Sequence, residues 1–546
     1  MIKTGVASAL LQRTAFTLAT TTIATTAITN TNSGSNANNT AVKMPASDGA
    51  VRVQQPPAAN DGPLQQKPQA PPTIYFPLGY KEAAYQWLLT RRLGIQWTSV
   101  TPAMAERKVL SFIPHLREAV DSVTAASPAP APADNSIKPD PFGTRVWRRS
   151  LVKLSGKNRA LNEVCVERVG EDEDETLVMV HGYGAGLGFF YKNLEPISRL
   201  PGLKLYALDM LGMGNSTRPP FKIRAKGKEQ QVIEAENFFV DALEEWRKAR
   251  KIERFTLLGH SLGGYLAVSY AIKYPGHLKK LILASPVGIP EDPYAVNASM
   301  PDPKESSTQQ DDFAQDQQAL TETKTPPTAA ASVGRTAKEA TPTAPRRPLP
   351  SWLVWLWDAN VSPFSIVRLT GPLGPRLISG WSSRRFNHLP PNEAQALHDY
   401  SFSIFKQKGS GEYALAYILA PGAYARRPVI NRIHHVGRQT LPAPPDALPS
   451  DAAVKETGIP IVFLYGENDW MDVAGGLAAE QKLKDARRQA LLGATDEQRR
   501  NEAGSARVTV IPKAGHNLHL DNPDDFNRMV TEEMEATMAV ERRRPR

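Results

Sequence analysis

The sequence predicts an α/β fold, with a mostly parallel sheet covered by helices on both faces and a helical cap inserted before the last strands. The first observation is that short apolar runs such as "TLVMVHG" (176–182) and "FTLLGHS" (255–261) alternate with helical patterns such as "EAENFFVDALEEWRKAR" (234–250). Apolar strands that alternate with helices build a parallel sheet buried on both sides. The second is that this alternation stops at 287 and resumes after 458.

The alternation divides the predicted core into two parts, 145–290 and 455–546. Its strand-like runs are 176–182, 203–210, 255–261, 278–286, 459–466 and 506–515. Helical patterns lie between them, as at 234–250 and 263–275. Each run has the length of one strand, so we predict that the core forms one open sheet whose sequence is interrupted once.

The interruption has two predicted parts. Residues 291–350 hold few large apolar side chains, so we expect a disordered insertion. Residues 351–440 show helical patterning and contain the tryptophans Trp352, Trp355, Trp357 and Trp381, so we expect this part to fold. A folded excursion at this point of an α/β sheet forms a cap over the carboxyl ends of the strands.

The chain before residue 145 predicts no further core. Residues 1–75 start with a Ser/Thr-rich stretch without any acid before Asp48, which is typical of an organelle presequence, here mitochondrial, and continue as a disordered region. Residues 76–124 show apolar spacing of short amphipathic helices, with basic side chains among aromatics. A Pro/Ala-rich linker at 125–141 leads into the core.

The net charge of +10 favours anionic partners. Without zinc-knuckle spacing or an RNA-binding motif, we expect a lipid surface and not nucleic acid as the partner. No apolar run reaches the ~18 residues that span a bilayer, so we expect peripheral contact with a membrane. The one cysteine, Cys165, is expected to be a small buried residue.

The stretch Gly259-His260-Ser261-Leu262-Gly263 carries the first chemical motif. It fits the G-x-S-x-G pattern of a nucleophile elbow, and a predicted strand precedes it and a predicted helix follows it, as the motif requires. The turn is so tight that side chains two residues before and after the serine would collide. Glycine is therefore required at 259 and 263, and Ser261 is the candidate nucleophile.

A serine hydroxyl needs a general base, which in turn needs a carboxylate. The order expected on such a sheet is Ser, acid, His. "YGENDWMD" offers Asp469 and Asp472, and "KAGHNLHLDNP" offers His516 and His519. We favour Asp469, in the first turn beyond its strand, with Asp472 as the alternative, and we favour His516 as the base. Asp209 precedes the serine, the wrong order, and is expected to be a structural turn residue.

The developing oxyanion needs two backbone N–H donors. We expect one from Leu262, next to the nucleophile, and one from Tyr183 in the loop "HGYGAGLGFFYKN". Gly182 and Gly184 of this loop let the backbone approach a substrate and are candidate binding residues. The loop lacks G-x-x-x-x-G-K-[ST], so no nucleotide site is expected, and we expect neither a cofactor nor a metal.

These motifs resemble the α/β-hydrolase superfamily over roughly 145–290 and 455–535. The stretches "HGYGAGLGFFYKNLEPIS", "LDMLGMGNSTRP", "GHSLGGYLAVSYAIKYP", "LKKLILASPVGIP", "SPFSIVRLTGPLGP" and "HNLHLDNP" resemble one lipid-handling branch most closely. That branch contains a mitochondrial cardiolipin-specific deacylase, lysophospholipid acyltransferase or lipase homologues, and a non-catalytic lipase co-activator. The resemblance implies Ser261 as nucleophile and His516 as base, and it points to Asp521, five positions after His516, in the H-x₄-D pattern linked to acyl transfer.

The expected function is therefore a serine-dependent phospholipid deacylase that acts on cardiolipin or a related glycerophospholipid, peripheral to the mitochondrial inner membrane. Trp352 and Trp355 of the cap are expected to line the acyl-chain channel. Two alternatives stay open. One is a lysophosphatidic acid or lysophospholipid acyltransferase, and the other is a non-enzymatic lipid-binding regulator.

Overall fold

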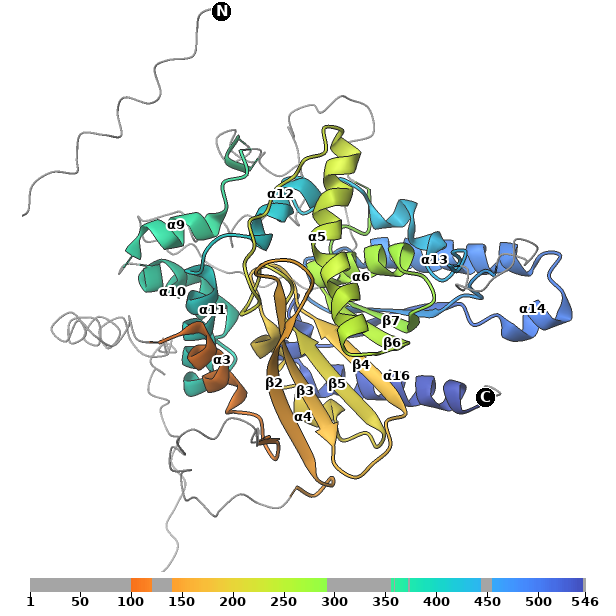
Figure 1. Cartoon of the computed structure of the whole chain (residues 1–546), viewed down its shortest axis with the longest axis horizontal. Helices are drawn as coiled ribbons and strands as arrows, with labels where there is room; N and C mark the ends of the chain where they lie inside the picture. Colours follow the sequence, from red (N-terminus) through yellow and green to blue (C-terminus); the bar gives the residue numbers. More distant parts are fainter. Residues whose placement is uncertain are drawn as a thin grey trace, which may run out of the picture. The chain divides into compact units, whose positions relative to one another are not determined.

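A nine-stranded sheet lies at the centre of the described chain (Figure 1). The computed structural model describes residues 100–119, 140–291, 355–357, 359–371, 374–442 and 454–543, all within the unit Tyr75–Arg546. The strand order is β1-β2-β3-β5-β4-β6-β7-β8-β9. The strands are β1 (Arg117–Glu118), β2 (Arg145–Lys153), β3 (Ala160–Arg168), β4 (Glu175–Val180), β5 (Leu203–Leu208), β6 (Phe255–His260), β7 (Leu278–Ala284), β8 (Pro460–Gly466) and β9 (Ser505–Ile511).

The sheet is mostly parallel, as the sequence predicts. The pairs from β5 through β4, β6, β7 and β8 to β9 are all parallel, whereas β3 is antiparallel to both β2 and β5. The carboxyl ends of the parallel strands therefore lie along one edge of the sheet, and the loops that follow β4, β6, β7, β8 and β9 meet there.

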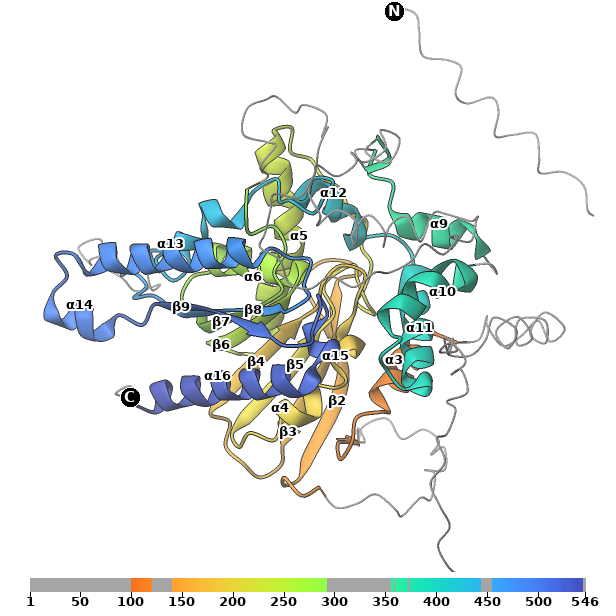
Figure 2. The same cartoon turned by 180° about the vertical axis from the view of Figure 1, so that it is seen from behind.

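Helices cover both faces of the sheet, because successive strand residues point to opposite sides. In β4, Leu177 and Met179 belong to one buried cluster, while Val178 and Val180 belong to the other. Figures 1 and 2 show the helices of the two faces. On the Val178 face lie α5 (Lys228–Ala249), α6 (Leu262–Lys273) and α13 (Val473–Leu491), and on the Leu177 face lie α4 (Leu194–Ile197), α15 (Leu518–Asp521) and α16 (Pro523–Arg543).

A helical cap is inserted between β7 and β8, as predicted. Its helices are α9 (Pro363–Leu369), α10 (Gly374–Arg385), α11 (Pro391–Phe405) and α12 (Leu415–Ile418), with the 3-10 turns η3 (Gly411–Ala414), η4 (Val429–Asn431) and η5 (Ile433–His435). Side chains of α9, α10 and α11 share the buried cluster of Leu177, so the cap is packed onto the core. The predicted disordered insertion lies outside the described residues except for Glu291. The remaining elements are η1 (Leu187–Phe190), after β4, and α14 (Asp496–Asn501), before β9.

Part of the predicted amphipathic segment 76–124 is described. It holds one helix, α3 (Pro102–Leu110), which begins where the Thr101 hydroxyl accepts a hydrogen bond from the Met104 N–H at 3.2 Å. The chain then continues to the edge strand β1, which pairs with β2. Residues 1–75, 76–99 and 120–124 lie outside the described part, so their predicted roles stay predictions.

Cys165 is buried on β3, as expected, and burial raises the pKa of its thiol. A buried, protonated thiol is inert. Among the residues that the structure describes, no helix is both long enough and apolar enough to span a bilayer.

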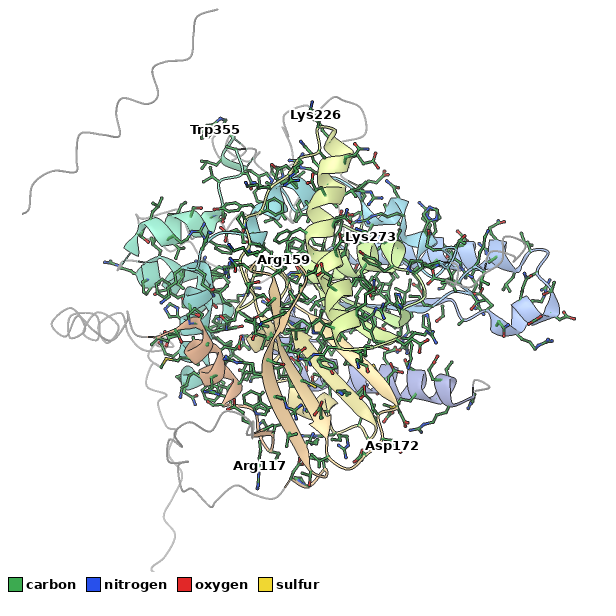
Figure 3. All side chains as sticks on the ribbon, in the orientation of Figure 1. Arg117, Arg159, Asp172, Lys226, Lys273 and Trp355 are labelled. Carbon is green, nitrogen blue, oxygen red and sulfur yellow. The ribbon has the colours of Figure 1, made fainter. Side chains whose placement is uncertain are left out.

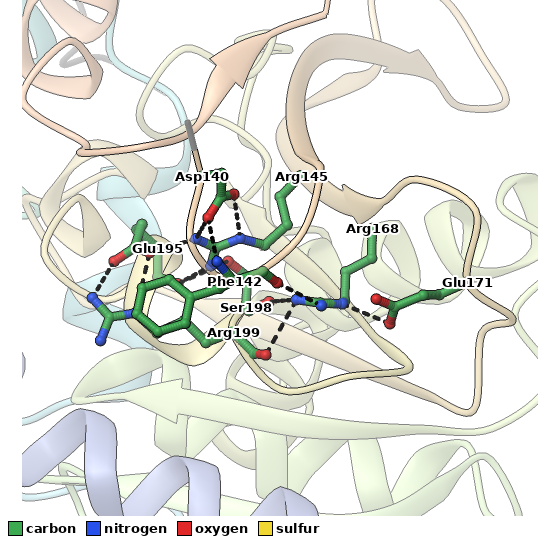
Figure 4. Close-up of polar contacts among 8 residues, drawn as sticks. All are labelled: Asp140, Phe142, Arg145, Arg168, Glu171, Glu195, Ser198 and Arg199. Atoms are coloured by element: carbon green, nitrogen blue, oxygen red, sulfur yellow. Dashed lines mark hydrogen bonds and ion pairs between the residues drawn. The ribbon is translucent and has the colours of Figure 1, made fainter. Parts of the chain in front are cut away.

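A buried ion cluster fixes the start of β2 against α4 (Figure 4). Arg145 pairs with Glu195 at 2.6 Å and with Asp140 at 2.9 Å, and its guanidinium also donates to the Ser198 hydroxyl at 3.1 Å. The side chains of Arg145 and Glu195 are fully buried. Arg199 also pairs with Glu195, at 2.8 Å, but from the solvent side, with 42% of its side chain exposed.

Replacing Arg145 with Met should lower the free energy of unfolding by about 3 kcal/mol, because buried carboxylates lose their main cationic partner. Arg199→Met is the matched control and should cost under about 1 kcal/mol, since the Arg199 side chain is 42% exposed and Glu195 keeps its bond to Arg145. Urea denaturation of both variants measures the difference. Equal losses of unfolding free energy in the two variants would show that the buried Arg145 stabilises the fold no more than the exposed Arg199 does.

Candidate active site

Ser261 occupies a strained turn between β6 and α6. Its backbone has φ 53° and ψ −117°, a conformation that a non-glycine residue adopts only where the surroundings impose it. A Cβ on Gly259 would lie 2.4 Å from the Gly263 carbonyl oxygen, and a Cβ on Gly263 would lie 2.6 Å from the His181 carbonyl oxygen. These distances confirm the steric reason for glycine on either side of the serine.

The structure brings Ser261, His516 and Asp469 together at the carboxyl edge of the sheet. The His516 Nε2 lies 3.0 Å from the Ser261 Oγ, and its Nδ1 lies 3.2 Å from an Asp469 oxygen. The three residues follow β6, β9 and β8, whose carboxyl ends share this edge. The imidazole therefore connects a hydroxyl on one side to a carboxylate on the other, which is the geometry of a serine activated by a general base.

The two candidate acids have separate positions. The Asp469 side chain is fully buried beside His516 and accepts the Met471 N–H at 3.0 Å. Burial raises the pKa of this carboxyl, but the hydrogen bond and charge of His516 act in the opposite direction, and the net result is a lowered pKa. Asp472 instead caps α13 by accepting the Ala474 N–H at 2.8 Å. Asp469 is thus the acid in contact with the imidazole.

Two neighbours of His516 were not found from the sequence. Ser285, directly after β7, donates its hydroxyl hydrogen bond to Asp469, and its Oγ lies 3.0 Å from the His516 Nδ1. The Trp470 ring lies 4.7 Å from the His516 ring at 46°. Ser285 has a positive φ of 48°. The sequence signal that could have indicated its role is a serine in "LASPVG", directly after the strand that lies beside β6.

His260 and His519 lie behind His516 and support its loop. The His260 Nε2 is 2.9 Å from the His516 carbonyl oxygen, and the His260 and His519 rings are 4.6 Å apart. Burial lowers the pKa of His260 well below its usual value, and it lowers the pKa of His519 to about 3, with the positive charge of Arg385 adding to the effect on His519. Both imidazoles are therefore neutral at physiological pH.

The loop after β4 passes directly beside Ser261. A Cβ on Gly182 would lie 2.9 Å from the Ser261 Cβ, so this position accepts only glycine. His181 fixes the loop. Its Nε2 accepts the Met210 N–H at 3.1 Å, so its Nδ1 carries the proton and donates to the Gly182 carbonyl at 2.7 Å. Because C=O and N–H of a trans peptide point in opposite directions, this bond turns the Tyr183 N–H away from His181.

Leu262 is the first residue of α6, and helix geometry gives its N–H no acceptor within the helix. The N–H groups expected to hold an oxyanion thus belong to the two segments that flank Ser261, namely the start of α6 and the Gly182-Tyr183 peptide. Tyr183 stacks on Phe364 of α9 with ring centroids 5.2 Å apart. A Cβ on Gly184, which has φ +65°, would lie 3.1 Å from the same phenylalanine ring. The cap therefore packs on the residues of this loop.

Of the two candidate tryptophans of the cap, the structure describes Trp355 alone, and its side chain is exposed to solvent. Trp352 lies outside the described residues. Trp355 is 67% exposed, and Figure 3 shows it at the periphery, because it stands on a short helical turn above the packed part of the cap. Cap aromatic side chains that lie against the loop include Phe364 and Phe405, which stack at 4.3 Å and would lie 3.1 and 3.6 Å from a Cβ on Gly184, and Trp381 lies 5.5 Å from Phe405.

Asp209 is structural, as its place in the chain predicts. It is buried and accepts hydrogen bonds from the Leu187 N–H at 2.6 Å, the Asn215 N–H at 2.7 Å and the Asn162 amide at 2.8 Å. The bond to Leu187 ties the far end of the Tyr183 loop to the turn after β5. Among the residues that the structure describes, no group of His, Cys, Asp or Glu has the geometry of a metal site.

Glu106 of α3 extends this cluster. It is buried beside Asp209 and accepts hydrogen bonds from the Asn162 and Asn215 amides at 2.9 and 2.7 Å. Burial, and next the negative charge of Asp209, raise the pKa of Glu106 to about 7, although Arg149 at 3.2 Å acts in the opposite direction. The N-terminal helix is thus tied to the Tyr183 loop through shared hydrogen bonds.

Asp469→Asn should slow the labelling of Ser261 by a fluorophosphonate by about 10³- to 10⁴-fold, because an amide cannot stabilise the imidazolium that forms on His516. Asp472→Asn is the matched control, since Asn caps a helix about as well as Asp, and should change the rate by less than about 2-fold. Labelling rates of both variants measured by mass spectrometry check this. A larger loss of labelling rate in Asp472→Asn than in Asp469→Asn would identify Asp472 as the catalytic acid.

Stability should fall as pH rises through the titration of Glu106. Because its folded pKa, about 7, exceeds the unfolded value of 4.5, the folded chain binds more protons between these limits. The free energy of unfolding should therefore decrease across this window, on the order of 2 to 3 kcal/mol from this group, and level off above it. Urea denaturation from pH 5 to 8 measures the slope. Glu106→Gln should remove it, whereas Glu118→Gln, at an exposed carboxylate, should retain it. An unchanged slope in Glu106→Gln contradicts the assignment.

Comparison with known proteins identifies the family of this chain. The family model described as the alpha/beta hydrolase fold matches residues 175–523. A protein of Arabidopsis thaliana named 1-acylglycerol-3-phosphate O-acyltransferase is 30% identical over 460 residues, which cover 82% of this chain and 84% of the relative. A (lyso)-N-acylphosphatidylethanolamine lipase of Mus musculus is 30% identical over 366 residues, which cover 66% and 80%. Among solved structures, a carboxylesterase of Bacillus subtilis aligns with a TM-score of 0.42 at 11% identity, covering 79% of this chain and 96% of its own. The chain belongs to the α/β-hydrolase family, among relatives whose names are those of lipid-acting enzymes.

Proposed function

We propose that this protein is a serine-dependent phospholipid acyl hydrolase, a deacylase of cardiolipin or a related glycerophospholipid. The observation that carries the proposal is the connected geometry of Ser261, His516 and Asp469, with 3.0 Å and 3.2 Å between successive groups. A hydroxyl, an imidazole and a buried carboxylate at these distances perform acyl transfer from an ester.

In the first half-reaction, the Ser261 Oγ attacks the ester carbonyl carbon while its proton moves to the His516 Nε2. Asp469, hydrogen-bonded to Nδ1, stabilises the imidazolium. The N–H groups of Leu262 and Tyr183 hold the negative oxygen, each contributing about 10²- to 10³-fold to the rate. The ester C–O bond then breaks, and His516 gives its proton to the departing lysolipid oxygen, which leaves an acyl-serine.

In the second half-reaction, water attacks the acyl-serine and His516 takes its proton. The tetrahedral intermediate collapses, the proton returns to the Ser261 Oγ, and the fatty acid leaves. Ser285, which donates to Asp469, and Trp470, whose ring packs at a tilt against His516, keep the carboxylate and the imidazole in place through both halves. No cofactor is required.

Support for a phospholipid substrate comes from the relatives. A lysophosphatidate acyltransferase and an N-acylphosphatidylethanolamine lipase are both named for chemistry at the acyl groups of phospholipids. Cardiolipin as the particular substrate, and a mitochondrial location peripheral to the inner membrane, are supported by the acid-poor N-terminal composition and by the resemblance of the motifs.

A second candidate function is transfer of the acyl group to a lysophospholipid instead of water. The plant relative named as an acyltransferase favours it, because the match covers 82% of this chain. Asp521 of the H-x₄-D pattern has a structural position: its carboxylate accepts the Gly515 N–H at 2.9 Å and so braces the loop of His516. Both functions share the acyl-serine and differ only in the acceptor.

Purified Ser261→Ala should release fatty acid from cardiolipin vesicles at least about 10³-fold more slowly than wild type, because it cannot form the acyl-serine. Ser379→Ala, at an exposed serine of the cap, is the control and should match wild type. Release is followed by mass spectrometry, in parallel with incubation of lysophosphatidic acid and acyl-CoA.

Equal release by wild type and Ser261→Ala would overturn the serine mechanism. Phosphatidic acid formed from lysophosphatidic acid in preference to free fatty acid would assign the acyltransferase function. If wild type neither turns over lipid nor reacts with a fluorophosphonate, the protein is the non-enzymatic lipid-binding regulator.

A further inference from the structure

Arg385, the last residue of cap helix α10, contacts the loop that carries His516. The Arg385 guanidinium donates to the Asn517 side-chain oxygen at 2.7 Å, and Asn517 directly follows His516. His388, just beyond the helix, lies 3.6 Å from Asp521, the last residue of α15, which follows this loop. The cap thus adds a permanent positive charge next to the proposed general base.

Arg385 is held in a defined position. Its guanidinium lies 5.2 Å from the ring centroid of Trp381, a cation–π contact from the preceding turn of α10, and its side chain is half-buried. Trp381 is itself buried among the aromatic residues of the cap. An arginine fixed by a ring and a hydrogen bond loses little freedom on binding a ligand, and the planar guanidinium matches the oxygens of a phosphate.

The positive charge of Arg385 acts on the groups around the base. After burial, it is the largest cause that lowers the pKa of His519, and it also contributes to the lowered pKa of His260. Helix α10 carries Arg376, Arg384 and Arg385 and no acidic residue. Burial raises the pKa of the nearby Asp521 carboxyl overall, and Arg385 acts to lower that pKa, so its positive charge acts on several groups around the base.

A glycerophospholipid carries its phosphate close to its acyl esters. The phosphorus and an acyl carbonyl carbon are separated by about five bonds in the 2-acyl ester and about six in the 1-acyl ester, or roughly 6 to 8 Å. Arg385 contacts Asn517, and the adjacent His516 contacts the Ser261 Oγ at 3.0 Å, so two consecutive residues of one loop connect the guanidinium to the serine.

We infer that Arg385 binds the phosphate group of the lipid substrate and selects phosphate-bearing acyl esters over neutral ones. The inference rests on the proposed function, whose substrate class it narrows. Arg385 is a binding residue in this scheme, and the chemistry remains with Ser261, His516 and Asp469.

The test compares two soluble esters with the same acyl chain, 1-octanoyl lysophosphatidic acid and 1-octanoylglycerol, so that membrane surface charge plays no part. In the full-length enzyme, Arg385→Gln should lower kcat/KM for the lysophosphatidic acid by about 10- to 100-fold, mainly through KM, as expected for loss of a charge-assisted hydrogen bond. It should change kcat/KM for octanoylglycerol by less than about 3-fold. Arg384→Gln, at the exposed neighbour, is the matched control and should leave both values unchanged.

An equal loss on both esters would overturn the inference and assign Arg385 to positioning the His516 loop through Asn517. No loss on either would show that Arg385 does not contact substrate. Failure of the proposed function is separate: wild type would then hydrolyse neither ester. Binding of octanoyl lysophosphatidic acid to the Ser261→Ala protein can be measured by tryptophan fluorescence. Its affinity should weaken about 10-fold or more when Arg385→Gln is added, and unchanged binding would refute the phosphate contact.

Discussion

The close packing of backbone around Ser261 is the constraint on which the site depends. A Cβ at Gly259, Gly263 or Gly182 would lie within 3.0 Å of a neighbouring atom, so β4, β6 and α6 approach one another only because these positions are glycine. The same packing holds Ser261 at a positive φ. Since β8 and β9 end at the same edge of the sheet, a base 255 positions away reaches the serine hydroxyl.

Buried polar groups next to this turn determine where the surrounding loops lie. A buried donor or acceptor without a partner costs about 1 to 3 kcal/mol, so hydrogen bonds to these groups favour one loop position over others. His181 meets this requirement with Met210 on one nitrogen and Gly182 on the other, and thereby orients the Tyr183 N–H. Asp209 does so with Leu187, Asn215 and Asn162. The Tyr183 loop is therefore held at both ends before any substrate binds, which is the preorganisation that an oxyanion site needs.

The cap completes the site from outside the sheet. Phe364 stacks on Tyr183, so the apolar packing of α9 rests on the loop beside the serine. Arg385 contacts the loop of the base, so α10 contributes charge on the other side. Helix α3 is linked to Asn162 and Asn215 because their side-chain amides donate hydrogen bonds to Glu106. A movement of the cap would thus affect the Tyr183 loop and the His516 loop together.

The local sequence determined what depends on local sterics and chain order: the mostly parallel sheet, the glycines around Ser261, and the order of serine, acid and histidine at strand ends. Asp469 was preferred over Asp472 because the chain places it in the first turn after β8, and its contact with His516 agrees. Tertiary structure alone decided the residues that act across elements. Ser285 and Arg385 meet Asp469 and Asn517 only through packing, and no pattern of spacing encodes a contact between distant segments. Trp355 is a surface residue and Trp381 a buried one, although both sit in helical patterns, because burial depends on which face of a helix meets the core.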